Sequence, residues 1–129
     1  MAETIHQEVR DAYGAIAYVG RPFHETHPNR LLAVAQLHGV APPKRETISV
    51  LEIGCGDGAN LVPMAASYPR GRFVGIDLSD RLVAIARALA EGAGIPNVTL
   101  LQGDVGTLPS RVGAFDVIVA HGFYSWVPP

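Results

Sequence analysis

The segment Glu52-Ile53-Gly54-Cys55-Gly56-Asp57-Gly58 combines an acidic residue with three glycines at alternate positions. Residues without side chains let the chain turn sharply and let a ligand approach the backbone closely. A predicted helix follows this loop directly, and the unpaired N–H groups at a helix N-terminus attract carboxylates and phosphates. The loop is therefore a candidate binding site for a ligand that carries such a group.

Further candidates stand at the ends of other predicted strands. Asp77 ends the second strand, where a carboxylate accepts hydrogen bonds from two neighbouring ribose hydroxyls. Asp104 follows the third strand. His121 and Tyr124 follow the fourth strand, and each has a group that can transfer a proton. We therefore predict His121 and Tyr124 as candidate catalytic residues.

Two other patterns have simpler explanations. His24-Glu25-Thr26-His27 suggests a metal site, but the zinc motif is His-Glu-x-x-His, and here Pro28 follows immediately. A helix cap with loop contacts explains this segment better. Cys55 has no basic neighbour in sequence to activate its thiol, so a small residue in a tight loop is sufficient explanation.

Four segments have the composition of buried parallel strands, because they are continuous aliphatic and β-branched runs rather than strict alternations. They are Ile48–Ile53, Arg72–Asp77, Val98–Gln102 and Phe115–Ala120. Strands that alternate with helices predict an α/β fold with a doubly wound parallel sheet and right-handed crossovers.

The predicted helices have recognisable ends. Ser79 is expected to cap Asp80–Glu91, which Gly92 and Gly94 then stop. Asn60 is expected to cap Asn60–Tyr68, which places Pro63 in the first turn, where its missing N–H is tolerated. Two further helices are predicted before the first strand, Thr4–Tyr13 and Pro28–Gly39.

Composition narrows the class of protein. The chain has 129 residues, 48% of them hydrophobic and 17% charged, with a net charge of −2. This charge argues against nucleic acid as a partner. Membrane attachment is not expected, because no apolar run approaches the roughly 20 residues that span a bilayer. The chain has one cysteine and no secretory signal pattern, so we expect a reducing compartment, the cytoplasm.

Three interpretations of the glycine loop remain at this point: a dinucleotide site, a different nucleoside cofactor, or a turn without a ligand. The residues resemble class I S-adenosylmethionine-dependent methyltransferases, whose first motif Glu/Asp-x-Gly-x-Gly-x-Gly is matched from Glu52 to Gly58. The acidic residues after their second and third strands are matched by Asp77 and Asp104. Glu52 favours this family, because a carboxylate there suits a cationic amino-acid ligand and would repel a pyrophosphate.

The resemblance narrows to a branch that includes bacterial protein-lysine methyltransferases with a C-terminal methyltransferase regulatory domain. Segments 13–31, 60–65 and 120–129 are similar to this branch, although Gly14 and Ala17 replace its usual Asp and Pro. The resemblance implies a Rossmann-like sheet of strand order 3-2-1-4 with helices on both faces. Residues 1–43 would form an N-terminal arm with a helix, and residues 44–129 a partial cofactor-binding core.

The resemblance also implies S-adenosylmethionine as cofactor and a set of residues that contact it. These are Glu52, Gly54, Cys55, Gly56, Gly58, Asn60, Asp77, Leu78, Asp104, Val105 and His121. Within this set, Glu52 would lie near the ammonium group, Asp77 would hold the ribose, and Asp104 and Val105 would meet the adenine. The methyl acceptor stays open between a small molecule and a protein lysine. A binding module without its own activity and an NAD-binding oxidoreductase fragment are the alternatives.

The fourth strand has a further consequence. Its apolar residues Val117, Ile118 and Val119 would lie at an uncovered sheet edge in this order of strands. The chain is therefore expected to be the N-terminal portion of a longer enzyme. An exposed apolar edge invites pairing with another strand, so we expect self-association through it.

Overall fold

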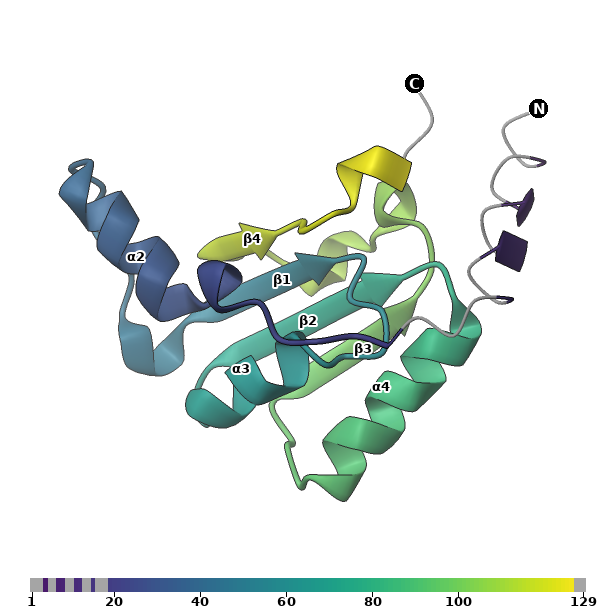
Figure 1. Cartoon of the computed structure of the whole chain (residues 1–129). Helices are drawn as coiled ribbons and strands as arrows, with labels where there is room; N and C mark the ends of the chain where they lie inside the picture. Colours follow the sequence, from purple (N-terminus) through teal and green to yellow (C-terminus); the bar gives the residue numbers. More distant parts are fainter. Residues whose placement is uncertain (1–3, 5–6, 9–10, 13–14, 16–18, 127–129) are drawn as a thin grey trace.

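A four-stranded parallel sheet forms the centre of the computed structural model, which describes residues 4, 7–8, 11–12, 15 and 19–126 (Figure 1). The order of the strands is β3-β2-β1-β4, as predicted. The strands are β1 (Ser49–Ile53), β2 (Arg72–Asp77), β3 (Val98–Gln102) and β4 (Val117–Val119). All three pairings between neighbouring strands are parallel.

The strand register brings the carboxyl ends of the strands together. Ile53 pairs with Ile76, and Asp77 pairs with Gln102. The loops after β1, β2 and β3 therefore leave the sheet side by side. β4 is shorter than the predicted Phe115–Ala120, and it pairs with β1 alone among the described strands.

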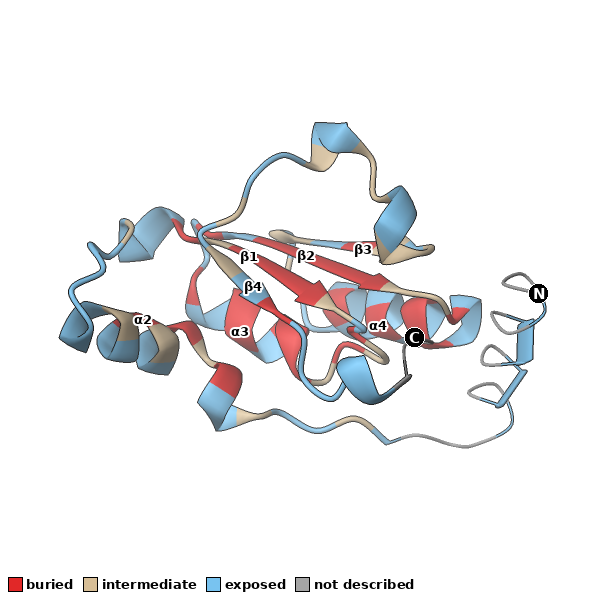
Figure 2. Cartoon of the chain, turned by 90° about the horizontal axis from the view of Figure 1, so that it is seen from above, coloured by how far each residue is buried: buried red, intermediate tan, exposed pale blue. Residues whose placement is uncertain are grey.

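Three α-helices cover one face of the sheet (Figure 2). They are α2 (Pro28–Leu37), α3 (Leu61–Ser67) and α4 (Asp80–Gly92). Their apolar faces and the sheet enclose the main core, in which Val50, Phe73 and Val83 are fully buried. Burial of side chains of this size stabilises the fold by roughly 2 kcal/mol each, so this core holds the helices against the sheet.

The opposite face is covered by the connection between β3 and β4, which contains the short 3₁₀ helices Val105–Thr107 and Ser110–Val112. Val105, Leu108 and Val112 pack there on the second apolar cluster around Val74. Three more 3₁₀ helices occur among the described residues: His24–Thr26, Arg45–Thr47 and Tyr124–Trp126.

The helices are close to their predicted bounds, although α2 ends at Leu37 before the predicted Gly39, and α3 is one residue shorter at each end than the predicted Asn60–Tyr68. Ser79 caps α4 as expected, since its hydroxyl accepts a hydrogen bond from the N–H of Leu82 at 3.2 Å. Gly92 belongs to α4, and the chain leaves the helix at Gly94, whose φ is +66°. Asn60 occupies the N-cap position of α3, but its side chain makes no capping hydrogen bond. The expectation of a capping asparagine was therefore wrong, because other partners hold this side chain.

Half of the residues of the predicted helix Thr4–Tyr13, as well as Gly14 and Ala17, lie outside the described residues. In the part of the chain that the structure describes, no helix is long and apolar enough to cross a bilayer.

Candidate functional site

The glycine loop between β1 and α3 combines two kinds of glycine. All three glycines have positive φ, +71° at Gly54, +54° at Gly56 and +78° at Gly58. A Cβ at Gly58 would lie 2.9 Å from the Cβ of Ala86 in α4, so this glycine lets the helix pack closely. A Cβ at Gly56 would meet nothing within 4 Å. Gly56 therefore leaves its backbone open to a ligand, as the sequence predicted for the loop.

Asp77 lies beside this open part of the loop. One of its carboxylate oxygens accepts a hydrogen bond from the Gly56 N–H at 2.9 Å, and the other accepts one from the Ser79 N–H at 2.9 Å. Two backbone donors therefore fix the orientation of the carboxylate. Each oxygen has a further lone pair, so Asp77 can still accept hydrogen bonds from a pair of hydroxyls.

Glu52 is a buried carboxylate at the end of β1, with an exposed fraction of 4%. Its Oε1 accepts a hydrogen bond from Asn60 Nδ2 at 2.6 Å, whereas its Oε2 is buried without a hydrogen-bond partner. Burial raises the pKa of Glu52 to about 7, with smaller contributions from Asp77 and Asp57, against the hydrogen bond from Asn60, which lowers it. A carboxylate oxygen without a donor is costly in such a place, and a further donor or a cation at Oε2 would offset that cost.

The arm Val19–His27 lies against the loop, and the sequence analysis did not identify these contacts. The Gly20 N–H donates to Asp57 Oδ2 at 2.8 Å, and the Phe23 N–H donates to Asn60 Oδ1 at 2.7 Å. A Cβ at Gly20 would stand 2.0 Å from an Asp57 oxygen, so only glycine fits there. These contacts join positions 37 residues apart, and no residue type in the arm signals them.

The predicted site residues Asp104 and Val105 lie in the loop after β3. The Gly103 N–H donates to the Asp77 carbonyl at 2.9 Å, which brings this loop next to Asp77. The Asp104 carboxylate accepts from the Gly106 N–H at 2.7 Å and thereby caps the 3₁₀ helix that begins at Val105. The Leu78 carbonyl accepts from the Gln102 side chain at 3.0 Å. Asp104, Val105 and Leu78 are thus held near one another at the carboxyl edge of the sheet.

The two candidate catalytic residues have different surroundings. The His121 ring forms a tilted stack with the Phe23 ring of the arm, with 4.0 Å between their centroids and 30° between their planes. The Tyr124 side chain is 91% exposed. Phe123, between these two residues in the chain, lies against Gly54 of the loop, since a Cβ at Gly54 would stand 3.0 Å from the Phe123 ring. The structure therefore brings His121 to the arm and leaves Tyr124 on the surface.

Cys55 points away from the site. Its side chain lies in the main core beside Gly75, and burial raises the pKa of its thiol. Any contact of Cys55 with a ligand would therefore involve its backbone.

The histidines of the arm make local contacts. His27 Nδ1 accepts a hydrogen bond from the Asn29 N–H at 3.3 Å and caps α2, as the cap interpretation predicts. His24 Nδ1 lies 3.1 Å from Glu25 Oε2. Among the described residues, no three metal-ligating side chains form a group that could hold an ion.

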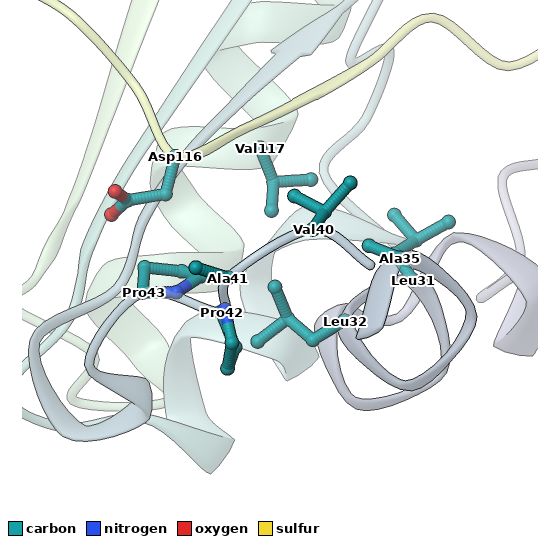
Figure 3. A pocket seen from close by; sticks show the side chains of 9 residues that line it. All are labelled: Leu31, Leu32, Ala35, Val40, Ala41, Pro42, Pro43, Asp116 and Val117. Atoms are coloured by element: carbon teal, nitrogen blue, oxygen red, sulfur yellow. The ribbon is translucent and has the colours of Figure 1, made fainter. Parts of the chain in front are cut away.

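A separate apolar hollow of about 530 Å³ lies between α2, the linker 40–43 and the start of β4 (Figure 3). Leu32, Val40 and Val117 line it. Its one charged residue, Asp116, is engaged by the Ser49 N–H and hydroxyl, each at 2.8 Å. This hollow lies at the amino end of β4, away from the carboxyl ends of the strands where the glycine loop lies.

Residues 50–129 match the methyltransferase domain family, and this range is more than half of the chain. The chain belongs to this family. The family predicted from Glu52 and the three glycines is therefore confirmed, and so is the Rossmann-like α/β fold.

Similar proteins share most of this chain. An uncharacterized protein of Rickettsia prowazekii is 39% identical over 116 residues, which are 90% of this chain and 46% of that protein. The structure of PKMT2 from Rickettsia typhi in complex with AdoHcy is 40% identical, with a TM-score of 0.82, over 86% of this chain and 22% of that one. Protein-lysine N-methyltransferase EFM4 of Saccharomyces cerevisiae is 31% identical over 78 residues, 60% of this chain and 34% of that protein. The chain thus spans less than half the length of each of these proteins.

Proposed function

We propose that this chain binds S-adenosylmethionine at the glycine loop and serves the transfer of its methyl group to a nucleophile. The observation that carries the proposal is Glu52, whose buried Oε2 has no hydrogen-bond partner. An ammonium group of an amino-acid ligand would supply the missing donor and neutralise the carboxylate. The similarity to PKMT2, whose structure contains AdoHcy, supports the same ligand class.

The other residues of the site fit the remaining parts of this cofactor. The open backbone at Gly56 suits the methionine part, and the fixed carboxylate of Asp77 suits the two ribose hydroxyls. Asp104 and Val105 are assigned to the adenine through the family resemblance. Cys55, Gly58 and Leu78 support this site through backbone and packing contacts, whereas Asn60 supports it through its side-chain hydrogen bond to Glu52.

The protein would contribute positioning and the exclusion of water rather than covalent chemistry. When bound, the cofactor supplies an electrophilic sulfonium methyl group. His121 follows β4 and stacks on the arm, so we assign to it the acceptor side of the site and removal of a proton from the acceptor. Tyr124 stays a secondary candidate, because its side chain is 91% exposed.

The acceptor we propose is an amine nitrogen, and a protein lysine is the specific candidate. Support comes from the similarity to EFM4, a protein-lysine N-methyltransferase. A small-molecule amine is the alternative within the same reaction class. We also propose a cytoplasmic location, since a reduced thiol at Cys55 suits that compartment.

A dinucleotide is disfavoured by the same carboxylate. The unpartnered oxygen of Glu52 would face the phosphates of NAD as a second negative charge, and like charges in a buried site repel strongly.

The other alternative is a cofactor-binding module without its own activity. Such a module would bind the cofactor as an enzyme does but would not transfer its methyl group. Transfer of a labelled methyl group to any lysine peptide by this chain would exclude that alternative.

The first test is calorimetric titration of the chain with S-adenosylhomocysteine and, in parallel, with NAD⁺. We expect micromolar binding of S-adenosylhomocysteine and none of NAD⁺. Glu52→Gln should weaken the binding, whereas Glu46→Gln, which changes an exposed carboxyl outside the site, should leave it unchanged. Binding of NAD⁺ alone would refute the proposal.

A further inference from the structure

A buried polar cluster connects the cofactor loop to the arm. Glu52, Asn60 and Thr26 have exposed fractions of 4%, 7% and 7%. Asn60 Nδ2 donates to Glu52 Oε1 at 2.6 Å and to Thr26 Oγ1 at 3.0 Å, while Asn60 Oδ1 accepts from the Phe23 N–H at 2.7 Å. The Thr26 hydroxyl donates in turn to the Phe23 carbonyl at 2.9 Å. Both backbone groups of Phe23 are therefore held by this cluster.

The chemistry of the partners fixes the orientation of the Asn60 amide. A carboxylate only accepts hydrogen bonds, so the amide nitrogen must face Glu52. A backbone N–H only donates, so the amide oxygen must face Phe23. Because the amide group is planar and rigid, a change at the Glu52 end is transmitted to the Phe23 end.

Phe23 extends this connection to the acceptor side. Its ring stacks on His121 at 4.0 Å, and the Arg21 guanidinium lies 5.2 Å from the same ring. His121 follows β4, whereas Glu52 is the penultimate residue of β1. The arm thus bridges the ends of two strands that would serve cofactor and acceptor.

We propose that Asn60 is a positioning residue that couples Glu52 to His121 through Phe23, so that a filled cofactor site holds the Phe23–His121 stack more firmly. This proposal rests on the cofactor site proposed above. A ligand ammonium at the unpartnered Oε2 keeps Glu52 ionised, and a charged acceptor strengthens the hydrogen bond from Asn60 Nδ2. Hydrogen bonds in a buried chain polarise one another, so the bond from the Phe23 N–H to Asn60 Oδ1 is strengthened as well.

The coupling is reciprocal: if cofactor binding stabilises the Phe23–His121 stack, loss of the stack must weaken cofactor binding. A double-mutant cycle tests this with S-adenosylhomocysteine calorimetry on the 129-residue chain. Phe23→Leu removes the aromatic ring, and we expect about fivefold weaker binding, at the lower end of typical couplings. In the Asn60→Ala background, Phe23→Leu should reduce the affinity for S-adenosylhomocysteine less than about twofold, since the connection through Asn60 is already broken. Phe23→Tyr retains the ring and is the matched control, with the affinity of the wild type.

A second measurement separates coupling from a merely structural role. The Phe23 ring current acts on His121, so NMR signals of the His121 ring should shift when S-adenosylhomocysteine is added to the wild type. The shift should disappear in Asn60→Ala. If circular dichroism shows Asn60→Ala to be unfolded, Thr26→Val replaces it, with Thr26→Ser as the control that retains the hydroxyl.

The outcomes distinguish the two proposals. If the wild type binds S-adenosylhomocysteine but Phe23→Leu reduces the affinity equally in the wild-type and Asn60→Ala backgrounds, the coupling is overturned. The proposed cofactor site is unaffected by that outcome. An unchanged His121 signal in the liganded wild type would do the same. Failure of the wild type to bind S-adenosylhomocysteine would overturn the proposed function, and the coupling with it.

Discussion

Replacing the buried carboxyl of Glu52 by an amide should remove a large pH dependence of stability. The pKa of Glu52 is raised from 4.5 to about 7 by burial, so the folded protein retains a proton that the unfolded chain releases more easily. The stabilisation of the folded state by this proton is therefore present in full below about pH 4.5 and is lost as the pH rises through about 7. A difference of about 2.5 pKa units corresponds to roughly 3 kcal/mol.

The assay is urea unfolding of the ligand-free chain, followed by circular dichroism between pH 5 and pH 8.5. Wild-type stability should decline relative to Glu52→Gln across this range, by up to roughly 3 kcal/mol. Glu46→Gln, at an exposed position, should follow the wild type. Parallel stability profiles for the wild type and Glu52→Gln would refute the argument from burial.

The same carboxyl should make ligand binding depend on pH in the opposite direction. An ammonium group binds the ionised form of Glu52, and the ionised fraction rises through pH 7. The affinity for S-adenosylhomocysteine should therefore increase about tenfold between pH 6 and pH 8. In Glu52→Gln this increase should be absent.

Three further predictions concern other parts of the site and the sheet. Asp77→Ala removes the acceptor for the ribose hydroxyls and should weaken S-adenosylhomocysteine binding by about 2 kcal/mol in calorimetry; unchanged affinity would contradict the assignment. Gly58→Ala should destabilise the fold by roughly 2 kcal/mol or more, because of its φ of +78° and the contact with Ala86, whereas Gly56→Ala, in open space, should cost only about 1 kcal/mol in urea unfolding. Ile118→Lys places a charge on the β4 edge, where Ile118 is 61% exposed, and should shift the chain toward monomer in light scattering; a wild type that is already monomeric would contradict the predicted self-association.

The parts of the site that sequence reasoning located are those that local order and sheet topology determine. Glu52 and the glycines lie within seven consecutive residues, and Asp77 ends a strand whose position follows from its apolar run. Parallel strands bring their carboxyl ends to the same edge, so the proximity of Asp77 to Gly56 was predictable. The hydrogen bond from the Gly56 N–H to the Asp77 carboxylate, at 2.9 Å, is a detail that only the structure shows.

The arm could not be placed in this way. Its contacts with the loop use the backbone N–H groups of Gly20 and Phe23, which every residue except proline has. Such donors leave no signature of residue type, and their acceptors are 37 positions away. The stack of Phe23 on His121 depends on the same placement, so it also had no signal in the sequence.

Asn60 shows how a sound local rule can fail for a functional reason. An asparagine directly before a helix normally caps it, and α3 gives up that stabilisation of about 1 kcal/mol. The amide instead serves Glu52, whose burial costs more than a missing cap. The missing helix cap and the buried carboxylate meet in the hydrogen bond between Asn60 and Glu52. A ligand cation at Glu52 Oε2 would offset the cost of both. Asn60 does not cap its helix, and Glu52 has a buried oxygen without a donor. Because a single ligand cation would account for both, we interpret the pair as a ligand site rather than as a packing defect.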